Sequence, residues 1–477
     1  MEELVSPPSA VDAFERLGDL PYALLLDSGA NPQRLGRYSF LAADPVAVVR
    51  SKGARMEIIP CASGATWGAA PDGDPLSAAR AFLRSVAAEA IPGIPPFQGG
   101  VAGYLGYDFG ATLERLPAPR YDDLAIPDVV LGCYAWVVAW DHGSSRAWVV
   151  TVGAQENAAR ARLAMLRERL AGPPRRPPRR LPDPPPPVEP ASFERAATYP
   201  VPDFPWLRSS FTHPGYLAAV ARVREYLLAG DIYQANLSQR LEAPFHGDPW
   251  DLYRRLRRIN PAPFAAYFDT GDLVVASASP ERFLRLTTDG AVETRPIKGT
   301  RPRGYGPEHD AALGQALTES EKDRAEHVMI VDLLRNDLSR VCALGSVRVP
   351  ELFSLERYAT VHHLVSTVVG RLRPSMDAID LIRATFPGGS ITGAPKIRAM
   401  EIIAELEPSA RGVYCGSVGY LSCTGAADLS IVIRTYLVRG ERVYFSVGGG
   451  IVVDSEPEGE YRETLDKAQA LIAALEP

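Results

Sequence analysis

Residues Gly132–Val152 read GCYAWVVAWDHGSSRAWVVTV, two runs rich in aromatic and β-branched residues on either side of a short polar segment. Such residues favour β-strands, and a glycine followed by two serines favours a tight turn. The stretch therefore predicts a β-hairpin, in which neighbouring strands run antiparallel. A helix from about residue 158 to residue 170 is expected to follow it.

The residues before this hairpin give further strand and helix signals. Two short apolar runs, Tyr22–Leu26 and Tyr38–Leu41, each end in residues typical of turns. Asp74 followed by Pro75 predicts the start of a helix, because aspartate is a favoured N-cap and proline fits the first helical position. The glycine-rich run Gly99–Asp108 lacks the lysine of a phosphate-binding loop and is expected to be a strand with close backbone neighbours. Residues 1–172 are assigned to an N-terminal α+β region.

Residues 173–205 are predicted to be a linker, because the segment is rich in proline and arginine and contains four consecutive prolines at 184–187. Residues 206–477 form the second region. Its expected helices are 213–230, 326–338, 377–385, 396–406 and 458–475, and its expected strands are 232–238, 418–422, 429–436 and 442–447. Helices and strands do not alternate strictly, which favours an α+β fold with large antiparallel sheets over a Rossmann or barrel fold.

The composition excludes several classes of protein. The chain has 477 residues, 46% of them hydrophobic and 23% charged, with a net charge of −6. This charge argues against a nucleic-acid or membrane-surface partner. The five cysteines lack a paired metal-ligand spacing, and no apolar run suits a signal peptide or a membrane span. A reduced, cytoplasmic location is therefore expected.

The segment Thr294–Arg303 reads TRPIKGTRPR and sets one lysine, Lys298, between a proline and a glycine. Proline fixes the backbone and glycine permits a close approach, so the lysine is expected to be aimed from a strand end. Arginines lie three residues away on both sides. An amine beside fixed positive charge loses its proton more easily, and a neutral amine is a nucleophile. The alternative is a solvated loop lysine.

Two glutamates near the C-terminus, Glu460 and Glu463, would share one face of the last predicted helix. Carboxylates without histidine or cysteine suit Mg²⁺, which keeps several waters. The same spacing also fits an ordinary charged helix face. Arg434 lies in an apolar run predicted to be a strand, which indicates an anion partner or a buried ion pair.

Five segments, in this order, carry a resemblance to a known family: SPERF (279–283), PIKGT (296–300), AEHVMIVDLLRND (325–337), FPGGSITGAPK (386–396) and EYRET (460–464). Together they resemble the chorismate-utilising enzymes, from about Phe211 to the C-terminus. The resemblance implies two large antiparallel β-sheets packed as a sandwich with helices outside, built from interleaved halves of the chain.

The resemblance also implies roles for individual residues. Glu326 and Glu463 would bind Mg²⁺, with Glu460 close to the ion or bonded through water. Lys298, Glu281 and His363 would be catalytic, with Glu281 as the general acid and His363 near the departing hydroxyl. The substrate-binding residues implied are Thr392, Gly393, Tyr414, Arg434, Gly448, Gly449, Gly450 and Lys467, of which Tyr414 and Arg434 would meet the carboxylates of chorismate.

Two positions separate members of this family. Those that add water carry a lysine where this chain has Gln234, and those that form anthranilate carry alanine where it has Lys298. The resemblance therefore implies conversion of chorismate and ammonia to 4-amino-4-deoxychorismate, a nitrogen transfer toward 4-aminobenzoate and folate. No cysteine has the setting of a glutaminase nucleophile, so a separate glutamine amidotransferase subunit is expected to supply ammonia.

Two alternatives remain. One is anthranilate formation, in which ammonia enters at C2 and pyruvate is lost. The other is a non-catalytic homologue that binds chorismate, or binds tryptophan between the sheets near Leu25–Ser28.

Overall fold

The computed structural model describes residues 1–29, 35–61, 73–153, 156–177, 181, 195–358 and 361–476. The helices are α1 (Ala10–Leu17), α2 (Pro75–Ser85), α3 (Gly110–Leu113), α4 (Glu156–Ala171), α5 (His213–Leu228), α6 (Pro249–Ile259), α7 (Pro307–Glu319), α8 (Glu321–Ser339), α9 (Ala378–Thr385), α10 (Lys396–Leu406) and α11 (Pro457–Leu475). Asp74 caps α2 by accepting a hydrogen bond from the Ser77 amide, as predicted. No helix in the described part of the chain is long and apolar enough to span a bilayer.

The strands form two large sheets in which every neighbouring pair is antiparallel. In spatial order, the first sheet contains β1 (Glu2–Glu3), β9 (Arg146–Thr151), β8 (Trp136–Asp141), β3 (Tyr38–Ala42), β2 (Leu24–Asp27), β13 (Phe264–Asp269), β14 (Val274–Ser279), β23 (Thr435–Arg439), β24 (Arg442–Ile451), β12 (Gln234–Pro244), β11 (Phe204–Ser209) and β10 (Tyr199–Val201), with β20 (Gly393–Ala394) beside β12. The predicted hairpin is the β8–β9 pair.

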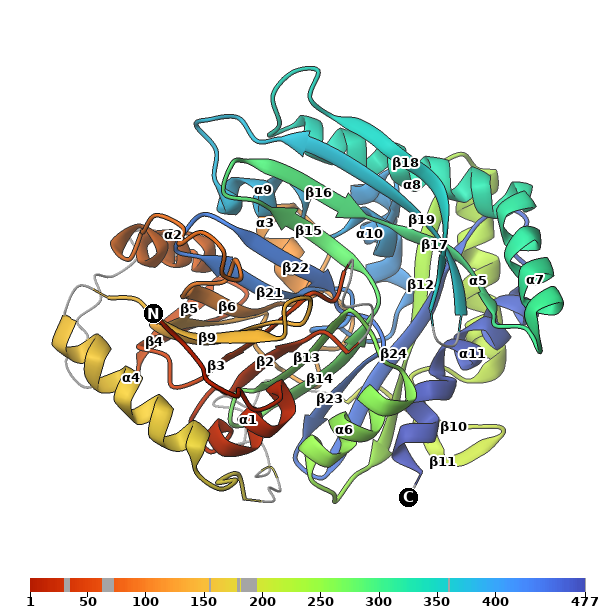
Figure 1. Cartoon of the computed structure of the whole chain (residues 1–477). Helices are drawn as coiled ribbons and strands as arrows, with labels where there is room; N and C mark the ends of the chain where they lie inside the picture. Colours follow the sequence, from red (N-terminus) through yellow and green to blue (C-terminus); the bar gives the residue numbers. More distant parts are fainter. Residues whose placement is uncertain are drawn as a thin grey trace.

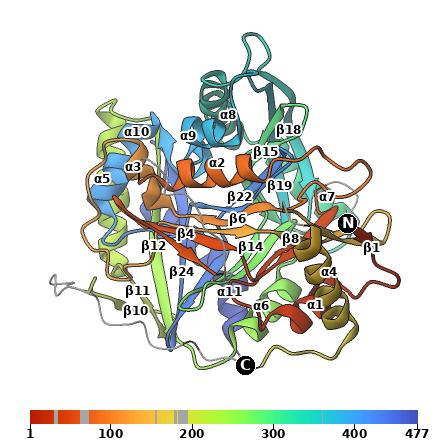
Figure 2. The same ribbon diagram turned by 90° about the vertical axis from the view of Figure 1, so that its left-hand side faces the viewer.

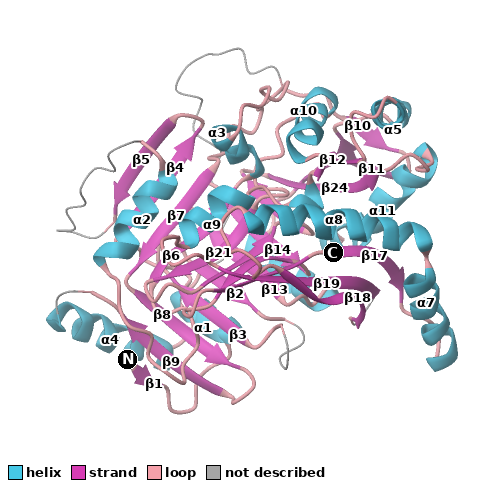
Figure 3. Ribbon diagram, turned by 90° about the horizontal axis from the view of Figure 1, so that it is seen from above, coloured by secondary structure: helices cyan, strands magenta, loops and turns pink. Residues whose placement is uncertain are grey.

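The second sheet contains, in spatial order, β17 (Ile297–Pro302), β19 (Val361–Arg371), β16 (Ala291–Arg295), β15 (Arg282–Leu286), β22 (Ala427–Ile431), β21 (Ser417–Ser422), β6 (Gly100–Leu105), β7 (Val129–Tyr134), β4 (Ala47–Lys52) and β5 (Arg55–Pro60), with β18 (Arg348–Arg357) beside β19. Figure 2 shows the strands between two layers of helices, with α2, α8 and α9 on one outer side and α1, α4 and α6 on the other. In Figure 3, α2, α9 and α8 lie in a row over the strands. The predicted α+β sandwich is confirmed.

The packing follows from strands that are buried on both faces. Large aromatic residues from both sheets, including Phe40, Phe268, Tyr104 and Tyr420, form one apolar cluster between them. Separate clusters lie under the two helix layers. Phe97 stacks on Tyr420 with ring centroids 4.6 Å apart. Burying aromatic rings of this size supplies much of the apolar stabilisation of a sandwich.

The two predicted regions are interleaved, as the resemblance implied. β2 pairs with β13 in the first sheet, and β6 pairs with β21 in the second, so both sheets draw strands from both regions (Figure 1). Within the segment 173–205 predicted to be a linker, β10 and the first two residues of β11 belong to the first sheet. Residues 178–180 and 182–194 of that linker lie outside the described residues.

The predicted strand 429–436 is also wrong in extent. It is two strands, β22 in the second sheet and β23 in the first, and the chain passes between the sheets at residues 432–434. Arg434 has φ 53° at this crossing. Apolar residues continue through the crossing, so the hydrophobic pattern does not indicate the break. Arg434 consequently lies between the sheets instead of within a strand.

Candidate active site

Lys298 lies near the start of β17, where the pairing with β19 is interrupted. Lys298 pairs with Leu364 and Thr300 with His363, with a register shift between them. Gly299 at that shift has φ 77°, a conformation that glycine adopts without strain. The Lys298 Nζ lies 3.0 Å from Glu326 Oε2. The predicted aimed lysine is therefore present, and its partner is a carboxylate from α8.

The two flanking arginines do not provide the free positive charge that the sequence suggested. Arg295 is bonded to Glu351 and Glu356. Arg301 is 2.9 Å from Asp323. Each arginine is neutralised by an acidic residue distant in sequence. The two arginines therefore do not stand beside Lys298 as unpaired charges.

Glu281 is buried in the short connection between β14 and β15. Its Oε1 accepts a hydrogen bond of 2.6 Å from the Ser390 hydroxyl. Burial raises the pKa of the Glu281 carboxyl to about 7, although Ser390, the Ile297 amide and the charge of Lys298 oppose that rise. A carboxyl with this pKa is half protonated near neutral pH, as a general acid requires.

The three glycines of β24 allow side chains from other elements to reach the strand. A Cβ atom at Gly450 would lie 2.5 Å from Lys298 Nζ and 2.9 Å from Gln234 Nε2. A Cβ at Gly449 would lie 3.1 Å from Glu460 Oε2 and 3.5 Å from Glu463 Oε1. These glycines therefore stand where the lysine and the glutamates converge. Gly448 O accepts a hydrogen bond of 2.8 Å from Lys467 Nζ.

Gln234, at the start of β12, is fully buried. Neither its amide nitrogen nor its amide oxygen has a hydrogen-bond partner among the described residues, and Asn236 Oδ1 is in the same condition. Buried amides without partners are costly unless a ligand completes their hydrogen bonds. The Gln234 amide is therefore available to form hydrogen bonds with a polar group of a bound ligand.

Of the three glutamates predicted to hold a metal, Glu326 and Glu463 pair with lysines, and Glu460 accepts a hydrogen bond of 2.6 Å from the Ser455 hydroxyl. Glu326 contacts Lys298, and Glu463 Oε1 is 2.7 Å from Lys467 Nζ. Lys467 lowers the pKa of the Glu463 carboxyl, whereas burial and the neighbouring Glu463 raise that of Glu460. In the described part of the chain, no three His, Cys, Asp or Glu side chains form a ready-made metal site. The converging oxygen donors nevertheless fit Mg²⁺ in their chemistry.

Arg434 adds a positive charge near Tyr414 and His363. Arg434 is half-buried, and no carboxylate among the residues described is paired with it. Burial lowers the pKa of the Arg434 guanidinium, and the neighbouring Tyr414 hydroxyl opposes that lowering. Burial also raises the pKa of the Tyr414 hydroxyl. Burial and the charge of Arg434 lower the pKa of His363 to about 3. His363 is therefore neutral at pH 7, and its Nδ1 lies 2.9 Å from Thr300 Oγ1.

The segment 386–396 brings Thr392 and Gly393 to β12. Gly393 pairs with Ala235, and a Cβ at Gly393 would lie 2.2 Å from Gln234 O. The fully buried Thr392 donates its hydroxyl to Gly388 O at 3.1 Å. Lys396, at the end of the segment, is held by buried Asp337 at 2.6 Å. Thr392 and Gly393 thus form a packed wall beside Gln234.

Several residues of the site were not predicted. Ser390 bonds Glu281, and Thr300 of β17 bonds His363, yet a single serine or threonine carries no functional signal of its own. Glu326 was expected to begin a helix, but α8 starts at Glu321. Ser320 is the N-cap and accepts a hydrogen bond from the Asp323 amide. A serine followed by acidic residues could have indicated this earlier start.

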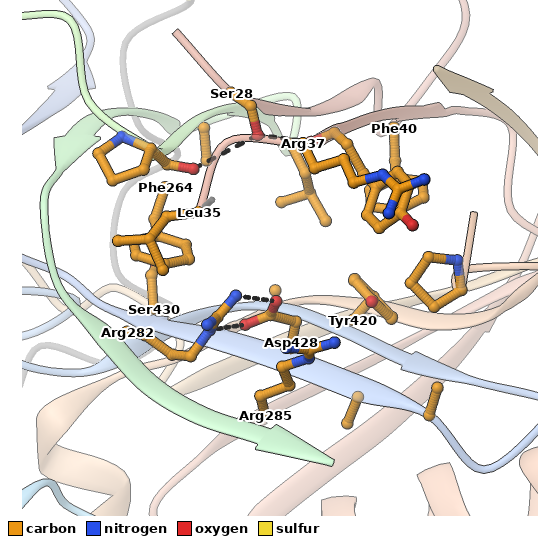
Figure 4. A pocket seen from close by; sticks show the side chains of 18 of the residues that line it. Ser28, Leu35, Arg37, Phe40, Phe264, Arg282, Arg285, Tyr420, Asp428 and Ser430 are labelled. Atoms are coloured by element: carbon orange, nitrogen blue, oxygen red, sulfur yellow. Dashed lines mark hydrogen bonds and ion pairs between the residues drawn. The ribbon is translucent and has the colours of Figure 1, made fainter. Parts of the chain in front are cut away.

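A separate cavity of about 370 Å³ lies between the sheets near Ser28. Figure 4 shows Ser28 and Arg37 on one wall and Arg282, Arg285 and Asp428 on the other. None of the predicted catalytic or metal-binding residues lines it. The alternative of a tryptophan site in this region stays a prediction.

Residues 22–473 match the family of chorismate binding enzymes, and the chain belongs to that family. Aminodeoxychorismate synthase component 1 of Salmonella typhimurium is 43% identical over 476 residues, which cover 98% of this chain and 96% of that protein. Anthranilate synthase component 1 of Thermus thermophilus is 45% identical over 406 residues, covering 84% and 83%. The crystal structure of anthranilate synthase component I from Streptococcus pneumoniae has a TM-score of 0.75 at 33% identity, covering 91% of this chain and 92% of that one. The family predicted from the motifs is thereby confirmed.

Proposed function

We propose that this protein acts as an aminodeoxychorismate synthase component 1, converting chorismate and ammonia to 4-amino-4-deoxychorismate. The observation that carries the proposal is the position of Lys298, whose amine stands against Gly450 beside the unpartnered amide of Gln234. An amine at this place can form a covalent bond to the substrate ring. Relatives named aminodeoxychorismate synthase component 1 are 38% to 43% identical over nearly the whole chain.

The charges of the site support an anionic substrate with two distinct ends. Arg434, without a carboxylate partner among described residues, and the Tyr414 hydroxyl suit one carboxylate of chorismate. The second carboxylate would face the cluster of glutamates. That face is acidic, so a cation is required there to bind an anion.

Mg²⁺ is proposed as that cation, held by Glu326 and Glu463 with Glu460 close by. When bound, Mg²⁺ would supply positive charge to a substrate carboxylate and to the departing hydroxyl. Glu326 would then be shared with Lys298, the residue that it contacts at 3.0 Å.

The chemistry assigned to the side chains proceeds in two displacements. The Lys298 amine forms a bond to C2, the ring double bonds shift, and the C4–O bond breaks as Glu281 gives its proton to the hydroxyl, which leaves as water. Ammonia then forms a bond to C4, the double bonds return, and the C2–N bond to Lys298 breaks. The new C4 ammonium gives a proton back to the Glu281 carboxylate, which restores the acid. Neutral His363 stands near the leaving group as a hydrogen-bonding group.

Ammonia is proposed to come from glutamine through a separate amidotransferase subunit. The relatives are named component 1, which implies a second component. The chain carries no cysteine in the setting of a glutaminase nucleophile. Glutamine alone should therefore not support the reaction, whereas ammonium salts should.

Product analysis tests the proposal directly. Purified protein is incubated with chorismate, ammonium chloride and Mg²⁺, and the products are separated by chromatography and identified by mass. The 4-amino product, which retains the enolpyruvyl group, is expected. Anthranilate with pyruvate would show that the second candidate, anthranilate synthase component 1, is correct. That candidate is kept because relatives with this name are equally similar over much of the chain.

A further inference from the structure

A buried ion pair lies behind the candidate substrate site. Glu407 follows α10 directly, and Arg411 lies four residues further on. Both side chains are about 95% buried, and they make two parallel bonds, Arg411 Nη2 to Glu407 Oε1 at 2.6 Å and Nε to Oε2 at 2.8 Å. A bidentate pair fixes both orientation and distance.

The other hydrogen bonds of this pair reach the backbone of two site segments. Arg411 donates to Ile391 O at 3.0 Å and to Asn236 O at 2.6 Å. Glu407 Oε1 accepts from the amide and from the hydroxyl of Ser238, both at 2.8 Å. One ion pair therefore ties β12 to the segment that carries Thr392 and Gly393.

The guanidinium of Arg411 also contacts the aromatic residues beside the site. It lies 4.5 Å from the ring centre of Tyr107 and 5.9 Å from that of Tyr414. Because Arg411 is paired with Glu407, Arg411 does not compete with Arg434 for the substrate carboxylate. Arg434, in contrast, has no carboxylate partner among the described residues.

We propose that Glu407 and Arg411 are positioning residues for the reaction. By holding Asn236 O and Ile391 O to one guanidinium, they keep the Thr392–Gly393 segment seated against β12, which pairs with the strand β24 that carries Gly448–Gly450. The proposed chorismate site is lined by this segment and by β24, so a shift of the segment is expected to weaken the binding of chorismate. The inference rests on the proposed function, and neither side chain is placed in contact with substrate.

The same strand offers a matched control. Arg240 of β12 forms a bidentate pair with Asp123 at 2.8 and 2.6 Å, and both side chains are 7% exposed. This pair has similar burial and geometry but joins β12 to the loop before β7, away from segment 386–396. A merely structural role would make the two pairs equivalent.

The test compares Arg411→Lys with Arg240→Lys. Lysine keeps the charge but cannot bond Glu407, Ile391 and Asn236 together. KM for chorismate is expected to rise at least tenfold in Arg411→Lys and less than twofold in Arg240→Lys, while both lower the melting temperature. Equal KM values in the two folded variants would overturn the positioning role.

A milder variant covers the case in which Arg411→Lys does not fold. Ser238→Ala removes one hydrogen bond to Glu407 and leaves both charges, and its KM for chorismate is expected to rise about threefold. An unchanged KM in Ser238→Ala together with an unfolded Arg411→Lys would overturn the proposal. Loss of chorismate by the unmodified protein is measured first. Its absence would refute the proposed function, whereas turnover with equal variants would refute only the positioning role.

Discussion

The residues of the site act on one another through charges set close together. The buried Glu281 carboxyl accepts a hydrogen bond from Ser390, and the charge of Lys298 partly opposes the rise of its pKa on burial. The position of Lys298 near a strand end was predictable from its neighbours, because Pro296 restricts the backbone and Gly299 permits a tight change of direction. The pairing of Arg295 and Arg301 was not predictable, because their carboxylate partners are distant in sequence. Local sequence therefore indicates the backbone conformation at a residue but not which side chains from other elements contact it.

Replacing Lys298 tests the covalent step. Lys298→Ala is expected to lower formation of the 4-amino product at least about 10³-fold, as loss of a nucleophile does. Chorismate should still bind within a few-fold, since Arg434 and Tyr414 are unchanged. Some 2-amino product is expected, because ammonia can attack C2 in the vacated space. Products are measured by chromatography and binding by titration.

The adduct on Lys298 can also be observed. Unmodified enzyme quenched during turnover should show by intact mass a chorismate-derived addition that maps to Lys298, and Lys298→Ala should lack it. Lys322→Ala, which removes an exposed lysine from the start of α8, serves as the control. An undiminished rate of 4-amino product in Lys298→Ala would eliminate the nucleophile role.

Glu281 links activity to stability through its raised pKa. Between its usual pKa of 4.5 and about 7, the folded protein keeps a proton that the unfolded chain has lost. Stability from this group therefore falls as pH rises through that window, by up to about 3 kcal/mol. Glu281→Gln removes this cost. The variant is expected to be more stable than the unmodified protein at pH 8, and about equally stable at pH 4.5, in urea unfolding.

The same variant should lose its activity. Removing the general acid is expected to lower kcat by about 10²- to 10⁴-fold. In the unmodified enzyme, kcat/KM should fall as pH rises above about 7, as Glu281 becomes ionised. Glu308→Gln, at an exposed position of α7, should change neither the stability nor the pH profile. A Glu281→Gln variant with full activity would remove Glu281 from the mechanism.

At the level of elements, the site depends on where strands and helices end. Lys396–Leu406 forms α10 with the bounds expected from sequence, because a proline precedes it and its apolar residues are regular. The strand predicted at 429–436 was wrong since an apolar run continues while the chain changes sheets. That crossing is what sets Arg434 between the sheets. The hydrophobic pattern therefore located the elements but not the crossing that carries Arg434.

The close approach to β24 gives a test of element spacing. Gly450→Ala would put a Cβ 2.5 Å from Lys298 Nζ, so the lysine must move. A displacement of this order is expected to lower kcat/KM about 10²-fold or more. Gly459→Ala is the control, since its Cβ would meet its nearest neighbour at 3.8 Å. Equal kcat/KM in the two variants would show that Lys298 does not act from this position.

The carboxylates of α8 and α11 are tested by metal binding. Mg²⁺ is expected to raise the melting temperature of the unmodified protein, because an ion that binds only the folded state stabilises it. Glu463→Gln and Glu326→Gln should abolish both this rise and turnover, and Glu460→Gln should weaken them. Glu458→Gln, an exposed change on the same helix, should behave as unmodified protein. A full rise in Glu463→Gln would refute its role as a ligand.

Across the whole molecule, both sheets are assembled from distant parts of the chain. β13 of the second region has β2 and β14 as neighbours, and β21 has β6 and β22. The apolar cluster between the sheets likewise contains residues from both regions. Periodicity identified the strands, but register across several hundred residues has no local signal. The interleaving was implied only by the resemblance to known proteins.

This interleaving predicts that the catalytic region cannot fold alone. A chain of residues 195–477 would leave β13 and β21 each with one open edge and would expose aromatic residues of the inter-sheet cluster. Open strand edges and exposed apolar surface favour aggregation. The fragment is expected to be insoluble or to lack a cooperative unfolding transition by circular dichroism. Co-expression with residues 1–177 should restore a soluble complex that consumes chorismate, because the sheets need both pieces but the cut lies between described strands. A fragment 195–477 that unfolds cooperatively by itself would show that the second region is an independent domain after all.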